Sequence, residues 1–173
     1  MSMRRLGDIR IDRIVEREDP VFVPTRLIPN ATPEALAPYR HWLEPKALDA
    51  ATGLFILPVQ SYVVRTRHHN ILIDGCLGED KTCRWHLPWH QLRGLRFLHD
   101  LAALGLAPED IDYVMCTHLH GDHVGWNTRL VDGRWVPTVW AVGSVDPAAV
   151  GLTPRLPIPM GEVRRRVGIF RDH

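Results

Sequence analysis

An apolar segment runs directly into a cluster of metal-ligand side chains in the sequence IDYVMCTHLHGDHVGW (111–126). Residues 111–117 have the mostly apolar composition of a strand that is buried on both faces. The next positions bring His118, His120, Asp122 and His123 within six residues of one another. Ligand sites in α/β folds favour loops at the carboxyl ends of strands. The segment therefore predicts an α/β chain with a functional loop directly after this strand.

Size and composition set the broad class of the protein. The chain has 173 residues, of which 45% are hydrophobic and 24% charged, as expected for one globular domain. A net charge of +1 argues against nucleic acid or an anionic membrane as partner. The odd number of cysteines, Cys76, Cys83 and Cys116, has no disulfide spacing, and residues 1–19 lack the apolar core of a signal peptide. We therefore expect reduced thiols and a cytoplasmic location.

The remaining pattern predicts elements around this loop. Strands are expected at 53–59, 61–66 and 70–75, with further strand-like alternation at 9–16, a helix at roughly 93–104 and a hairpin at 128–138. Residues 19–53 read as loop with short helical turns, one of them starting after Thr32. Gly105 is a natural helix end, and Asp132-Gly133 predicts a type I′ turn.

The chemistry of the loop follows from its spacing. Residues two apart in an extended segment point the same way, so His118 and His120 can reach one metal ion together. Asp122 and His123 lie beyond the turn at Gly121 and can address a second position nearby. Such a pair of ions can activate a bridging water at neutral pH. The competing interpretation is a solvated loop, which four ligand-type residues in so short a span make less attractive.

The segment HLHGDH (118–123) matches the HxHxDH signature of the metallo-β-lactamase fold hydrolases. The segments ILIDGC (71–76) and LGLAPEDIDYVMCTHLHGDHVGWN (104–127) also resemble that family. The segments SYVVRTRHHNILIDGCLG (61–78) and THLHGDHVGWNT (117–128) are most similar to its lactonase and organophosphate-hydrolase branch. The resemblance covers roughly residues 9–138. It implies an α/β (α+β) fold, namely the N-terminal portion of a metallo-β-lactamase-like αββα sandwich.

The resemblance also implies a site and a reaction. His118 and His120 would bind one Zn²⁺, and Asp122 and His123 a second, although other divalent transition metals suit the same ligands. Asp122 would also handle the proton of the attacking water, and Asp74 would orient the loop from behind. The substrate would be a small lactone, ester or phosphoester. A second copy of the chain, as a homodimer, stays open as a partner.

Residues 139–173 do not resemble the family. The family completes its site with a later His, a bridging Asp and a final His, and this tail offers no segment in those contexts. Because the tail is irregular and rich in Val, Pro, Gly and Arg, we expect a domain at 1–138 and an atypical tail, with a shifted reading frame preferred over a divergent C-terminus. The alternative function is an inactive or vestigial metal-binding fragment. His86 and His90, with Trp85 and Trp89, would line a pocket or form a separate apolar cluster.

Overall fold

The protein is described by a computed structural model over residues 3–84, 86–94 and 96–138. The chain divides into two units, Met1–Val142 and Gly143–His173. The predicted tail at 139–173 lies outside the described residues, and Trp85 does as well. Within the described part of the chain, no helix is long and apolar enough to cross a membrane.

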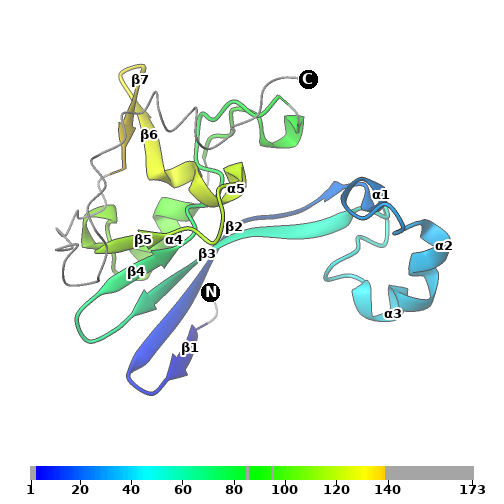
Figure 1. Ribbon diagram of the computed structural model, residues 1–173, viewed down its shortest axis with the longest axis horizontal. Coiled ribbons are helices and arrows are strands. Elements are labelled where there is room, and N and C mark those ends of the chain that lie inside the picture. The colour runs from blue at the N-terminus through cyan, green and yellow to red at the C-terminus, as the bar shows by residue number, and fades with distance from the viewer. Residues whose placement is uncertain (1–2, 85, 95, 139–173) are drawn as a thin grey trace. The chain divides into compact units, whose positions relative to one another are not determined.

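Five strands of the described residues form one sheet in the order β1-β2-β3-β4-β5 (Figure 1). Their bounds are β1 Met3–Leu6, β2 Ile9–Phe22, β3 Phe55–Arg65, β4 Asn70–Ile73 and β5 Tyr113–Met115. The first four strands pair antiparallel, whereas β4 and β5 are parallel. A parallel pair needs a crossover connection, and residues 74–112 provide it. As a result, β4 and β5 both end at the same edge of the sheet.

The predicted strands at 53–59 and 61–66 are one continuous strand, so Pro58 does not separate them. Pro58 lies opposite Glu18 on β2, whereas β4 pairs only with Tyr62–Arg65. Around Pro58 the described sheet therefore has a partner on one side of β3 alone, where a residue without an N–H group is tolerated. The prediction at 9–16 was likewise too short, because pairing with β3 carries β2 on to Phe22.

Short helices connect the far ends of β2 and β3, as expected for residues 19–53. They are α1 Pro24–Leu27, α2 Pro33–Leu36, the 3₁₀ turn η1 Ala37–Tyr39 and α3 Arg40–Leu43. The predicted start after Thr32 is confirmed, because the Thr32 hydroxyl accepts a hydrogen bond from the Ala35 amide at 3.2 Å. This is the usual way to satisfy a free amide at a helix start.

Helix α4, Phe97–Ala103, packs against the sheet and supplies Phe97 and Leu101 to the core. Their partners include Ile14, Val63 and Leu72 from β2, β3 and β4. The helix begins later than the predicted 93–104, because Gly94 has a left-handed φ of 68°. Gly105, with φ 76°, ends the helical segment as predicted.

Strand β5 contradicts one prediction, because it has three residues and is not buried on both faces. It is the edge strand of the described sheet, and Met115 is 57% exposed. The hairpin prediction is confirmed by β6 Thr128–Val131 and β7 Arg134–Pro137, joined by Asp132 (φ 49°) and Gly133 (φ 73°). The remaining short elements are η2 Leu87–Trp89, η3 Pro108–Asp110, α5 Gly121–Val124 and η4 Gly125–Asn127.

Candidate metal centre

The HLHGDH loop leaves the carboxyl end of β5 and turns into the single helical turn α5. The His123 amide donates to the His120 carbonyl at 3.0 Å, which closes that turn. Asp74 follows β4 at the same sheet edge, and its amide donates to the Met115 carbonyl at 2.8 Å. The parallel pairing of β4 and β5 thus places Asp74 directly behind the loop.

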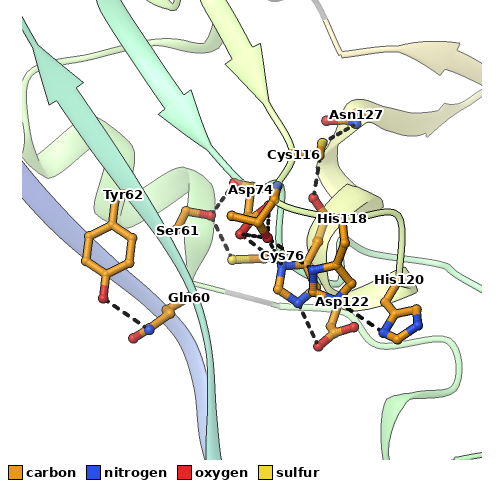
Figure 2. A network of polar contacts seen from close by, with 12 residues as sticks. Gln60, Ser61, Tyr62, Asp74, Cys76, Cys116, His118, His120, Asp122 and Asn127 are labelled. Carbon is orange, nitrogen blue, oxygen red and sulfur yellow. Dashed lines mark hydrogen bonds and ion pairs between the residues drawn. The ribbon is translucent and has the colours of Figure 1, made fainter.

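The predicted ligands come together in two pairs of donor atoms (Figure 2). His118 Nε2 lies 3.1 Å from His120 Nδ1, and His123 Nε2 lies 3.4 Å from Asp122 Oδ2. The rings of His118 and His123 are also adjacent, with centroids 3.8 Å apart. These are the two pairs for which the sequence analysis predicted separate metal positions.

The spacing within each pair fits a shared divalent ion. Two donors that each lie 2.0–2.1 Å from a tetrahedral zinc are about 3.3 Å apart. The two separations, 3.1 Å and 3.4 Å, are close to that value. Imidazole nitrogen and carboxylate oxygen are also ligands that zinc accepts. In the described part of the chain, however, no three His, Cys, Asp or Glu side chains converge as one metal-binding group.

The Asp74 carboxylate contacts both the backbone of the loop and the His123 ring. The carboxylate accepts hydrogen bonds from the Thr117 amide at 2.7 Å and the Thr117 hydroxyl at 2.9 Å, and it lies 2.9 Å from His123 Nδ1. A proton held on His123 Nδ1 leaves the Nε2 lone pair available to a metal. Burial opposes ionisation of Asp74, but the hydrogen bonds from His123 and Thr117 outweigh it and lower its pKa.

Sequence reasoning missed the residues that support this turn. The buried Ser61 hydroxyl on β3 donates to the Asp74 carbonyl at 2.6 Å and lies 3.0 Å from Cys76 Sγ (Figure 2). Asp74 and Cys76 have φ of 64° and 45°, a conformation that side chains other than glycine adopt at a cost. The available signal was a serine at the position between Val59 and Val63 in the alternation of β3. Cys76 itself is a buried free thiol, as expected.

His86 and Trp89 pack with Phe22 of β2 in an aromatic cluster. Phe22 and His86 stack with centroids 4.5 Å apart, and Trp89 meets both rings edge-on. The His90 ring accepts a hydrogen bond from the Cys83 amide at 3.1 Å. These contacts favour the apolar-cluster interpretation over a pocket lining. His68 and His69 lie exposed in the β3–β4 turn.

The amino-acid sequence has a curated relative among lactonases. It is 27% identical over 129 residues to the N-acyl homoserine lactonase AiiB of Agrobacterium fabrum. The alignment covers 69% of this chain and 40% of the lactonase. The chain therefore spans well under half of the length of this relative.

Three solved structures resemble the fold. A probable metal-dependent hydrolase from Staphylococcus aureus gives a TM-score of 0.57 at 25% identity and covers 73% of this chain and 43% of its own. The dizinc quorum-quenching lactonase AidC gives 0.53 at 18% identity, covering 72% and 37%. AbOPH, a hydrolase in the beta lactamase superfamily, gives 0.55 at 24% identity, covering 96% and 52%. The last two, at lower identity, bear on the fold alone.

A family model settles the assignment. Residues 54–151 match the model of the metallo-beta-lactamase superfamily, and this range is more than half of the chain. It contains β3 to β7 and the whole HLHGDH loop. The structural neighbours agree with the expected metallo-β-lactamase fold, of which the chain spans 37% to 52% of each neighbour's length. This chain belongs to the metallo-beta-lactamase superfamily.

Proposed function

We propose that this chain is the ligand-bearing part of a zinc-dependent hydrolase that cleaves small lactones, esters or phosphoesters. The observation that carries the proposal is the pairing of donor atoms, His118 with His120 at 3.1 Å and Asp122 with His123 at 3.4 Å. Membership of the superfamily and the 27% identity to a lactonase support it. A lactone is therefore the first substrate class to test.

Different residues of the loop would bind the metal ions and accept the proton of the attacking water. His118 and His120 would hold one divalent ion, and Asp122 with His123 a second. A bound ion supplies Lewis acidity and lowers the pKa of a coordinated water. The Asp122 carboxylate, partly exposed beside His123, is positioned to accept a proton from the attacking water. Asp74, held by the Thr117 amide, would keep the proton of His123 on Nδ1 and leave the lone pair of Nε2 available to the ion.

A second candidate function is metal binding without turnover. Its motivation is that each pair brings two ligands, whereas hydrolytic zinc sites commonly keep about three protein ligands and an open position. Two ligands hold an ion less rigidly against a substrate, which weakens the positioning on which catalysis depends.

Turnover with and without zinc separates these functions. The zinc-loaded 173-residue chain would be assayed on an N-acyl homoserine lactone, an aryl ester and a phosphotriester, before and after chelation. The proposal expects hydrolysis of at least one substrate that chelation abolishes and added zinc restores. Bound zinc without hydrolysis of any substrate would favour the second candidate. Hydrolysis that survives chelation would contradict both.

A further inference from the structure

Strand β2 carries a carboxyl group where the alternation of the strand calls for an apolar side chain. Asp12, Ile14 and Glu16 share its buried face, and Glu16 is only 5% exposed. A buried carboxylate is costly unless hydrogen bonds compensate for its lost hydration. Burial indeed raises the pKa of Glu16, although hydrogen bonds from Leu77 and Trp126 counteract the effect.

The hydrogen bonds of Glu16 reach two segments that are far apart in the sequence. Its Oε2 accepts from the Leu77 amide at 2.9 Å, and its Oε1 accepts from the Trp126 indole Nε1 at 2.5 Å. The backbone of Gly78 also hydrogen-bonds to this carboxyl group. One segment follows Asp74, and the other follows the ligand pair Asp122 and His123.

These two segments lie in direct backbone contact. The Gly75 amide donates to the His123 carbonyl at 2.6 Å, the Gly125 amide to Cys76 at 2.7 Å, and the Trp126 amide to Gly75 at 2.7 Å. A Cβ atom on Gly125 would collide with the Leu77 carbonyl, so the contact requires glycine. The indole of Trp126 also stacks on Phe97, with ring centroids 5.4 Å apart. The two segments are therefore packed backbone against backbone, and Glu16 forms a hydrogen bond with each of them.

We propose that Glu16 is a positioning residue for the metal centre, holding the Asp74 turn and the Asp122–His123 turn in register through Leu77 and Trp126. Glu16 acts through these two residues and contacts none of the four ligands by a hydrogen bond or ion pair among the described contacts. Its loss would let the two turns shift apart, which would weaken the contact between Asp74 and His123 Nδ1 that fixes the His123 tautomer. This inference rests on the proposed function, since the ligands matter only if the loop binds metal.

Zinc affinity of the full 173-residue chain, by competition with a chromophoric chelator, tests the inference. Glu16→Gln places an amide NH₂ against donors and should weaken zinc binding about 10-fold or more, as loss of groups behind metal ligands does. Trp126→Phe keeps a ring against Phe97 but removes one donor, and it should weaken binding in the same direction. This milder variant serves if Glu16→Gln does not fold.

Asp12→Asn is the matched control, because Asp12 is a buried carboxylate on the same face of β2 but pairs with Arg10 and Arg65. It should lower stability without changing zinc affinity. Hydrogen exchange of the metal-free protein should show faster amides at 74–78 and 121–127 for Glu16→Gln but not for Asp12→Asn.

The outcomes separate this inference from the proposed function. Zinc affinity that is equal in wild type, Glu16→Gln and Trp126→Phe would overturn the role of Glu16 and leave the proposed function intact. An equal loss in Glu16→Gln and Asp12→Asn would also overturn it, because affinity would then follow stability alone. A wild-type chain that binds no zinc would overturn both.

Discussion

Asp122 and Asp74 are neighbouring carboxylates whose surroundings assign them different tasks. Asp74 is buried and accepts hydrogen bonds from Thr117, with His123 2.9 Å away, so its lone pairs are engaged. Asp122 is only partly buried, and within residues 3–138 as far as they are described its ion-pair contact is to His123 at 3.4 Å. A carboxylate whose lone pairs remain accessible can bind a metal and accept a proton, whereas a saturated one holds a structure in place.

Replacement of each carboxylate by its amide should therefore affect a different property, namely activity at Asp122 and stability at Asp74. Asp122→Asn is expected to lower kcat/KM of an active form by about 100-fold or more, because an amide ligates poorly and is no base. Its free energy of unfolding should stay within about 0.5 kcal/mol of wild type. Asp74→Asn should cost about 1–3 kcal/mol of stability, because its NH₂ would face hydrogen-bond donors. Retention of most turnover by Asp122→Asn would show that this carboxyl group has no central role.

At the scale of elements, the lack of a side chain at Gly125 lets the backbone that follows Asp122 and His123 lie close to the turn that follows Asp74. Gly125 begins the 3₁₀ turn η4 directly after α5, and its position has no room for a Cβ beside Leu77. We expect Gly125→Ala to lower the free energy of unfolding of the metal-free chain by about 1–3 kcal/mol, as overpacking does. Chemical denaturation would measure it.

Gly121→Ala is the control, because a Cβ at Gly121 meets nothing within 4 Å and its φ is not left-handed. It should change stability by less than about 0.5 kcal/mol. Equal stabilities of the two variants would show that the two turns are not in the tight contact described.

The hairpin β6–β7 is tied to the loop after Asp74 by Lys81. Its Nζ donates to the Thr128 carbonyl at 2.8 Å and hydroxyl at 2.7 Å and lies 3.8 Å from the Trp135 ring centroid. Burial lowers the pKa of Lys81 to about 8 from 10.5, against the raising influence of Asp80. In the unfolded chain the ammonium group keeps its ordinary pKa.

This shift predicts a pH dependence of stability. Between about pH 8 and 10.5 the unfolded chain holds a proton on Lys81 that the folded chain has released. Raising the pH through this window therefore favours the folded state. Urea denaturation should show the stability of wild type rising relative to Lys81→Met, in which other titrating groups are unchanged. A constant difference across the window would contradict the lowered pKa.

At the scale of the whole molecule, the sequence correctly predicted the helix ends and turns that depend on residues close together in the chain. The Thr32 cap, the Gly105 helix end and the Asp132-Gly133 turn each follow from backbone conformations that one or two residues determine. The continuation of β3 through Pro58 was missed because strand length depends on pairing with β2. A period-two pattern contains no information about a distant partner.

At the candidate site, too, residues that are close together in the sequence were predicted, and residues that depend on distant partners were missed. The predicted ligands could be named because four ligand-type residues lie close together in the sequence, and Asp74 could be named through the family resemblance. Ser61 and Glu16 could not, because their partners are 13 and 61 positions away. For Glu16, the hint was a charged residue at a core-facing position of an alternating strand. Such a group is stable only with tertiary partners that sequence alone does not reveal.

We propose that the HLHGDH loop binds a divalent metal, and the zinc content of the purified protein tests this most directly. The wild-type chain would be equilibrated with zinc, desalted and compared with His118→Ala/His120→Ala by elemental analysis. A matched double variant, His68→Ala/His69→Ala, removes two exposed histidines from the β3–β4 turn instead. We expect wild type and the matched variant to retain zinc and His118→Ala/His120→Ala to lose it. Equal zinc content in all three proteins would contradict the assignment of the loop as the metal centre.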